Sequence, residues 1–295
     1  MRSSSKDRVH KMAPSADRWK KRSGVAKAVG VSVYKNVVYN TDCIDGMKKM
    51  DDESVDLIVT DPPYLMNYKT NYRKDKNHRF CKTIQNDDNE QLIKDFIAES
   101  HRVLKDDSAV YIFCNSNKID FFKQEVEKYF KIKNIIVWIK NNWTAGDLQA
   151  AYGKQYEFII YANKGRKKFN GKRITDVWFF DRVSGKEQLH QNQKPTELIE
   201  LCVEKSSNEN DLVLDPFMGS GTTAVASRNL NRDFIGFELE SEFCDMCNER
   251  MENKFPKVKR LTSSNREKIF TNDWLEITEK ADGANFSFFR KNDNE

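Results

Sequence analysis

The sequence predicts an α/β protein whose mostly parallel sheet is covered by helices on both faces. Short apolar runs alternate with amphipathic helical segments along most of the 295 residues, a pattern typical of parallel strands joined by helical crossovers. Two of the apolar runs end in unusual motifs, Asp61-Pro62-Pro63-Tyr64 and a glycine loop over residues 215–223. Open α/β sheets bind ligands at the carboxyl ends of their strands, so both motifs stand where a site would form.

Each element follows from a local pattern. Strands are expected where apolar and β-branched residues cluster, at 37–39, 54–60, 109–114, 132–139, 155–162, 211–214 and 234–237. Helices are expected where apolar residues recur at helical spacing, at 44–50, 92–104, 121–130, 196–205 and 224–230. The prolines that follow residue 60 end that strand abruptly, because proline cannot donate to a sheet ladder.

The composition limits the class of protein. Apolar residues make up 38% and charged residues 32% of the chain, so a core and a long solvated surface are both expected. The net charge is only +5, so any site for a polyanion must come from local clusters of basic residues. No apolar stretch could span a bilayer and no signal peptide is present, which favours a soluble, cytoplasmic protein without a membrane partner.

The six cysteines are scattered, which suits reduced thiols in a cytoplasm. Cys244 and Cys247 have CxxC spacing but lack a second pair. Two partly buried thiols are therefore favoured over a metal site, and no metal is expected.

Three basic segments lie outside the expected core. Residues 1–32 form an arm that is either disordered or a phosphate-binding tail. Residues 67–82 are either a lid or nucleic-acid contact beside the first motif, or a disordered insertion. Residues 163–193 interleave basic and aromatic side chains, which suits phosphate and base contacts but also a surface β-excursion.

The tetrapeptide at Asp61 can hold an aromatic amine. Its carboxylate and the Pro62 carbonyl can accept hydrogen bonds from an exocyclic amino group, and Tyr64 can stack on the ring that carries this group. The alternative is an ordinary strand that ends in a Pro-Pro turn with a buried tyrosine.

The glycine loop has the layout of a nucleotide-type cofactor site, with a strand before it and a helix after it. Gly219 and Gly221 permit tight turning, and the helix that follows directs free N–H groups at an anionic group. Glu238, at the end of the next strand, is placed to bind ribose hydroxyls. The loop lacks the third glycine of a dinucleotide site and the lysine of a P-loop. A nucleoside with a small charged tail, such as S-adenosylmethionine, therefore fits better than NAD or ATP.

Together the two motifs resemble the amino-methyltransferases of DNA, in the circularly permuted order of their β group. Supporting matches are Asn40-Thr41-Asp42-Cys43, Arg102-Val103-Leu104-Lys105, Gln193-Lys194-Pro195 and Ile235-Gly236-Phe237-Glu238-Leu239-Glu240. The family more often has His-Pro-Thr where this chain has His190-Gln191-Asn192, but Lys194 and Pro195 remain. The resemblance gives a methyltransferase domain over residues 33–255, with a target-recognition region at about 141–193.

The resemblance implies the S-adenosylmethionine-dependent methyltransferase fold, with a seven-stranded sheet that contains one antiparallel strand. S-Adenosylmethionine is the implied cofactor, Asp42 contacts its adenine and Glu238 its ribose. The residues expected to hold its methionine part are Lys194 and Pro195 together with Asp215, Phe217, Gly219, Ser220, Gly221, Thr222 and Thr223. The implied catalytic residues are Asp61, Pro62, Pro63 and Tyr64.

The expected activity is methylation of adenine N6 in double-stranded DNA, with the target base flipped out of the duplex. Cytosine-N4 methylation is the alternative within the family, whose cytosine enzymes usually have serine where this chain has Asp61. A DNA-binding protein that kept the fold and lost catalysis is a third possibility, against which the intact tetrapeptide argues. The sequence leaves open a homodimer, a cognate restriction endonuclease and hence a restriction-modification role.

The chain after about residue 255 departs from the methyltransferase pattern. Residues 256–268 are expected to be a charged linker. Residues 269–295 resemble the start of an RNA ligase nucleotidyltransferase domain, in which Lys280 matches the lysine that becomes adenylated. No further ligase motif follows, so this fragment is expected to be incomplete and inactive as a ligase.

Overall fold

A computed structural model describes residues 34–66, 85–144, 147–183, 193–253, 275–279 and 286–290. Four segments singled out in the sequence lie outside the described residues: the arm at 1–32, the basic loop at 67–82, the linker at 256–268, and Lys280.

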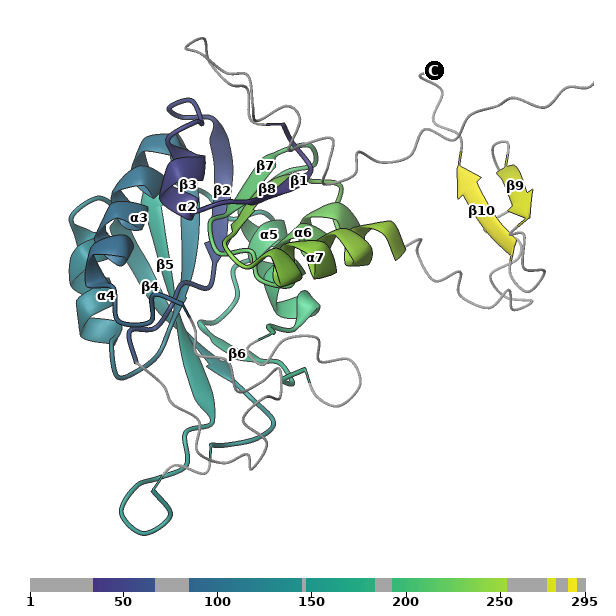
Figure 1. The fold of residues 1–295 in the computed structure, drawn as a ribbon. Helices are drawn as coiled ribbons and strands as arrows, with labels where there is room; N and C mark the ends of the chain where they lie inside the picture. Colours follow the sequence, from purple (N-terminus) through teal and green to yellow (C-terminus); the bar gives the residue numbers. More distant parts are fainter. Residues whose placement is uncertain are drawn as a thin grey trace, which may run out of the picture.

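The described residues contain an eight-stranded sheet whose strand order is β1-β8-β7-β2-β3-β5-β4-β6 (Figure 1). The strands are β1 (Val37–Asn40), β2 (Val55–Thr60), β3 (Leu104–Cys114), β4 (Lys131–Ile139), β5 (Tyr156–Lys164), β6 (Val177–Phe179), β7 (Leu212–Asp215) and β8 (Asp233–Glu238). Only β5 runs antiparallel to its neighbours β3 and β4. The mostly parallel α/β fold with one antiparallel strand is thus confirmed, with eight strands in place of the expected seven.

The additional strand β6 lies within the segment expected to be a loop or β-excursion. It pairs with β4 so that Trp178 is opposite Trp138. Both indole groups are buried and donate to backbone carbonyls, Trp138 Nε1 to Phe180 O and Trp178 Nε1 to Thr175 O, each at 2.8 Å. Only the central residue of this three-residue strand is buried, so no apolar run marks it in the sequence.

Helices cover both faces of the sheet (Figure 1). They are α2 (Cys43–Met47), α3 (Glu90–Val103), α4 (Ile119–Glu127), α5 (Thr196–Ser206), α6 (Thr222–Asn229) and α7 (Ser241–Asn253). Strand β2 shows how the two faces are filled. Ile58 packs into the cluster that contains α2, α3 and α4. Leu57 and Val59 pack into the cluster that contains α5, because successive side chains of a strand point to opposite faces.

The position of β2 explains its continuous apolar sequence. The strand lies between β7 and β3, and its residues Leu57, Ile58 and Val59 are fully buried. A strand covered on both faces needs apolar residues at every position rather than at alternate ones. The end of β2, where Asp61 follows, is therefore fixed in the middle of the sheet.

Two further findings concern the rest of the chain. Strands β9 (Leu275–Glu279) and β10 (Phe286–Arg290) pair antiparallel with each other in a separate two-stranded sheet. Among the residues that the structure describes, no helix is long and apolar enough to cross a membrane.

Candidate active site

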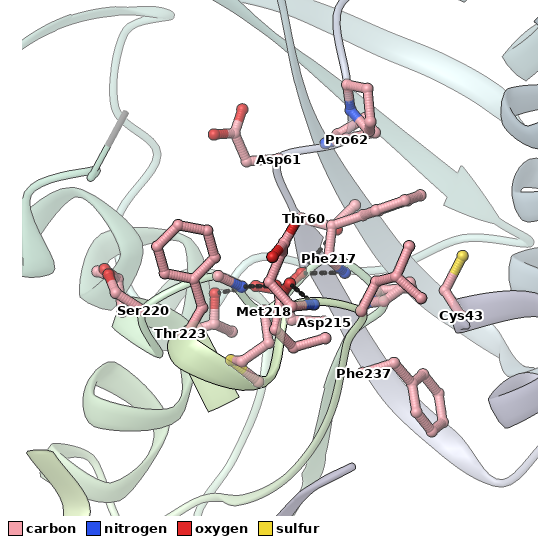
Figure 2. Close-up of a pocket in the computed structure, with 18 of the residues that line it drawn as sticks. Cys43, Thr60, Asp61, Pro62, Asp215, Phe217, Met218, Ser220, Thr223 and Phe237 are labelled. Atoms are coloured by element: carbon pink, nitrogen blue, oxygen red, sulfur yellow. Dashed lines mark hydrogen bonds between the residues drawn. The ribbon is translucent and has the colours of Figure 1, made fainter. Parts of the chain in front are cut away.

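A single pocket lies at the carboxyl ends of four neighbouring strands, β1, β8, β7 and β2 (Figure 2). Asp42 follows β1, Glu238 ends β8, the glycine loop follows β7, and Asp61 follows β2. Every site residue predicted from the sequence lines this pocket except Pro195 and Gly221. The sheet therefore brings together two motifs that are about 150 residues apart in the chain.

Asp215 organises the glycine loop from within. Its Oδ1 accepts from Thr60 Oγ1 at 2.7 Å and from the Phe217 amide at 3.1 Å. Its Oδ2 accepts from Thr223 Oγ1 at 2.6 Å (Figure 2). Burial raises the pKa of Asp215 to about 6, against the opposing effect of these hydrogen bonds. The carboxylate thus joins both ends of the loop and ties β7 to β2.

The two glycines of the loop have different tasks. Gly219 has φ +53°, and a Cβ added there would meet nothing within 4 Å, so its backbone borders open space in the pocket. Gly221 has φ +85° and begins α6, and a Cβ there would lie 2.2 Å from the Cys247 sulfur. The second glycine is therefore needed for the close approach of α7 rather than for lining the pocket.

The same contact accounts for the CxxC pair. Cys247 and Cys244 are both buried thiols on α7, as expected. Burial raises the pKa of Cys247 to about 12. No group of side chains that could hold a metal ion occurs within the described part of the chain.

Two carboxylates line the pocket on the side of the glycine loop, where a cofactor is expected. Glu238 accepts from the Gly219 amide at 2.7 Å and from the Glu240 amide at 2.8 Å. Burial raises the pKa of Glu238, which these two hydrogen bonds counteract. Asp42 is the N-cap of α2, where its Oδ1 accepts from two backbone amides. A carboxylate offers about four acceptor positions, so both groups keep capacity for a ligand's hydroxyl or amino groups.

The wall between these carboxylates and Asp61 is partly apolar. Phe217 lines the pocket and packs edge-on against the buried Phe96, with ring centroids 5.2 Å apart. This part of the pocket fits a nucleoside with a short polar tail, because it combines open space at Gly219, an aromatic wall and two carboxylate acceptors.

Asp61 is held by two neighbours on the opposite side of the site. Lys194 Nζ donates to Asp61 Oδ2 at 2.5 Å, and the Tyr64 hydroxyl donates to Asp61 Oδ1 at 2.5 Å. Lys194 also donates to the Tyr64 hydroxyl at 3.2 Å. Burial raises the pKa of Asp61, and the positive charge of Lys194 opposes this rise.

Glu157 completes this network, although sequence analysis did not identify it. Its carboxylate lies 3.4 Å from Lys194 Nζ and 3.2 Å from the Tyr64 hydroxyl oxygen, and it pairs with Lys140. Burial alone would raise the pKa of Glu157, but Lys194 and Lys140 outweigh it and lower the pKa to about 2. The sequence signal that could have identified Glu157 is a charged residue directly before the apolar run Phe158-Ile159-Ile160-Tyr161-Ala162.

Lys194 therefore lies nearer the catalytic motif than the sequence suggested. Its ammonium has three N–H donors, and Asp61, Tyr64 and Glu157 are placed to accept one each. Burial would lower the pKa of Lys194, but the two carboxylates raise it above its ordinary value. Pro195 is the N-cap of α5 and is not among the residues that line the pocket. A contact of either residue with the methionine part of a cofactor stays a prediction.

Comparisons with known proteins match this geometry. A family model described as DNA methylase covers residues 55–249. The type II methyltransferase M2.MboI of Moraxella bovis is 33% identical over 247 residues, which cover 75% of this chain and 89% of that protein. The DNA adenine methyltransferase YhdJ of Escherichia coli (strain K12) is 31% identical, over 79% of this chain and 90% of that protein.

Solved structures agree. The crystal structure of the M1.HpyAVI–SAM complex matches with a TM-score of 0.57 at 30% identity, covering 73% of this chain and 98% of that one. The PvuII DNA methyltransferase, which is cytosine-N4-specific, matches with a TM-score of 0.61 at 15% identity, over 75% and 87% of the two chains. At that identity the second match shows a shared fold alone.

Replacement of Glu238 tests the cofactor side. We expect Glu238→Ala to weaken S-adenosylmethionine binding by about 1.5–3 kcal/mol, because charge-assisted hydrogen bonds are lost. Isothermal titration calorimetry measures the change. Glu242→Ala, at an acid in the first turn of α7 that does not line the pocket, is the matched control. An unchanged dissociation constant for Glu238→Ala would mean that the cofactor is held elsewhere.

Proposed function

The chain belongs to the N6/N4 family of DNA methylases, and from this premise we propose that it methylates the N6 amino group of adenine in double-stranded DNA. Its cofactor is S-adenosylmethionine, which supplies an electrophilic methyl group on a sulfonium. One observation carries the proposal: a single pocket contains both the glycine loop after β7 and the Asp61-Pro62-Pro63-Tyr64 motif after β2. The order of these motifs in the chain supports assignment to the permuted β group.

Adenine is favoured over cytosine by the first residue of the tetrapeptide. Asp61 presents a carboxylate where the family's cytosine-N4 enzymes usually have serine. YhdJ, a relative whose name specifies adenine, is 31% identical to the chain. Cytosine-N4 methylation is the second candidate. A non-catalytic DNA-binding role is disfavoured because the Asp61 carboxylate is present and ion-paired with Lys194, which also pairs with Glu157.

The target amino group is a poor nucleophile, because its lone pair is delocalised into the aromatic ring. Asp61 and the Pro62 carbonyl can accept its two N–H groups, which favours a pyramidal nitrogen with its lone pair directed at the methyl group. Asp61 can then receive the proton that leaves as the new bond forms. Tyr64, whose hydroxyl is fixed by Asp61 and Glu157, supplies its ring face to the base. Holding both reactants in line removes much of the entropic barrier.

Lys194 and Glu157 act on the reaction through Asp61. The Lys194 ammonium favours the anionic form of Asp61, which is the form that accepts hydrogen bonds. Glu157 opposes this by raising the pKa of Asp61, so Asp61 stays basic enough to accept a proton. We infer that both are positioning residues that set the charge of Asp61.

The wider setting belongs to the same proposal. The base must leave the duplex to reach a pocket at the carboxyl ends of the strands. Residues 141–193 are proposed to recognise the surrounding DNA. Relatives named type II methyltransferases support a restriction-modification role. A cognate endonuclease and a homodimer stay open. The thiols of the described cysteines are free, which suits a cytoplasmic location.

Removal of the Asp61 carboxylate tests the catalytic assignment. We expect Asp61→Ala to reduce methyl transfer by at least about a hundredfold and to leave S-adenosylmethionine binding intact, because Asp61 lies apart from Gly219 and Glu238. A radiolabelled methyl-transfer assay and calorimetry measure the two effects, and mass spectrometry of digested DNA identifies the product.

Asp61→Asn, which keeps the size of the side chain but removes its charge, separates loss of charge from loss of shape. Near-wild-type turnover of Asp61→Ala would refute the catalytic role of Asp61. Digests that contain N4-methylcytosine without N6-methyladenine would establish the second candidate.

The pH dependence of the reaction tests the network. Activity should fall as the pH drops through the pKa of Asp61, because the protonated form cannot accept both an N–H and a proton. Glu157→Gln removes a charge that raises this pKa, so the acid limb of kcat/KM should move to lower pH. Lys194→Met removes a charge that lowers it, so the limb should move to higher pH.

The two variants serve as mutual controls, since they disturb the same network with opposite signs. The other titratable groups that face Asp61, which are Tyr64, Cys114 and Asp215, stay in place in both. Shifts in the same direction would show that the pH profile reports general loss of structure instead.

The C-terminal residues are proposed to take no part in methylation. The family match ends at residue 249, and the strands β9 and β10 pair only with each other. We expect deletion after residue 255 to leave methyl transfer within about twofold of the full chain. Incubation of the full chain with labelled ATP and magnesium should leave Lys280 unmodified. Loss of methylation on deletion would show that the C-terminal residues contribute to methyl transfer. A stable adenylate on Lys280 would show that the ligase-like segment is active.

A further inference from the structure

Within the loop between β4 and β5, the described residues 147–151 form an ordered tip. The Ala151 amide donates to Asp147 O at 3.1 Å, and the Asp147 carboxylate accepts from the amides of Gln149 and Ala150 at 2.9 and 3.2 Å. These bonds close one helical turn. The turn presents Leu148, which is 82% exposed, and is followed by Tyr152, which is 99% exposed.

The stem of this loop is held by its own contacts. The Lys140 amide donates to Gln155 O at 2.8 Å, and the Thr144 amide donates to Lys154 O at 2.9 Å. Trp143 packs against Gly153 so closely that a Cβ there would lie 2.5 Å from the indole. Leu148 and Tyr152 therefore add nothing to the packing of the loop, although a stem and a cap hold their backbone in place. Exposed apolar side chains on an ordered support are typical of contact sites.

The base of the loop is connected to the charged network at Asp61. Its first residue, Lys140, pairs with Glu157, which in turn contacts Lys194 and Tyr64 beside Asp61. In Figure 1 the loop projects past the lower edge of the sheet, beyond the end of β4. Tyr152 is three residues before Gln155 at the base of the loop, so it reaches at most about 11 Å from that base.

The charge around the tip fits a polyanion. Lys154 donates to the neutral amide of Asn117. Arg182 lies beside the stem, since its amide donates to Asn141 Oδ1 at 3.3 Å. Among the described side chains, no carboxylate pairs with Lys154 or Arg182. An apolar tip whose stem carries Lys154 and lies beside Arg182 suits a duplex, whose bases stack on apolar groups and whose phosphates attract cations.

We propose that Tyr152, with Leu148 beside it, is a wedge that enters duplex DNA next to the target base and fills the space the base leaves. The aromatic ring replaces the stacking that the remaining bases lose, and this stabilises the extrahelical state. The proposal rests on the proposed function, because it requires a base to leave the duplex, but it applies equally to adenine and cytosine.

The test compares substrates that differ in how firmly the target base is paired. Sequencing of DNA exposed to the wild-type enzyme first identifies the methylated motif, and duplex oligonucleotides with that motif are then used. We expect Tyr152→Ala to lower kcat/KM on the fully paired duplex by roughly ten- to a hundredfold, the range expected for loss of one stacked base. On a duplex with an abasic site opposite the target, the same variant should regain most of the wild-type rate. Tyr152→Trp, which keeps an aromatic ring, should stay close to wild type on both.

Tyr129→Ala is the matched control, because Tyr129 is an exposed tyrosine two residues before β4, at the opposite end of that strand. It should behave as wild type on both substrates. Fluorescence of 2-aminopurine placed at the target position reports the extrahelical base directly, and its rise on binding should be reduced in Tyr152→Ala alone.

Two results would overturn the wedge. Unchanged activity of Tyr152→Ala on the paired duplex would remove its basis. An equal loss on paired and abasic substrates, together with a changed oligomeric state in sedimentation, would assign the tip to contact with a second copy of the chain. Failure of the proposed function is distinguishable, since the wild-type enzyme itself would then leave the duplex unmethylated.

Discussion

The ion pair between Lys194 and Asp61 is the interaction on which the rest of the site depends. A buried ammonium is tolerated only when paired and hydrogen-bonded, and Lys194 has a carboxylate on two sides. The three elements involved are the turn after β2, strand β5 and the chain entering α5. Their convergence fixes Asp61 at one position, so the charge that we propose to face the target amine is set before any substrate arrives.

The two halves of the pocket are stabilised in different ways. On the side proposed to bind the cofactor, Asp215 and Glu238 accept most of their hydrogen bonds from backbone amides and a hydroxyl group of the glycine loop. On the target side, charged side chains bind one another, and the backbone contributes little. The first half is held by hydrogen bonds within the loop, whereas the second is held by charged groups. This difference suits a cofactor that is always the same and a proton that must move.

Much of this could be predicted from the sequence, because strand ends and turns are local patterns. The alternation of strands and helices gave the fold class, and the proline and glycine motifs identified two strand ends at which the pocket forms. What escaped prediction depends on contacts between distant residues. Glu157 and Lys140 gain their role only when β4 and β5 pair beside Asp61. Strand β6 is too short to leave a pattern, and the task of Gly221 is set by Cys247 on a later helix.

The role of the Lys194–Asp61 ion pair is tested most directly by a crystal structure of the enzyme with a non-reactive S-adenosylmethionine analogue and a duplex that contains the methylated motif. We expect the target amino nitrogen to lie within about 3.2 Å of both Asp61 and the Pro62 carbonyl oxygen, with Lys194 still bonded to Asp61. A structure in which the Lys194 ammonium and the Asp61 carboxylate have separated would contradict this expectation.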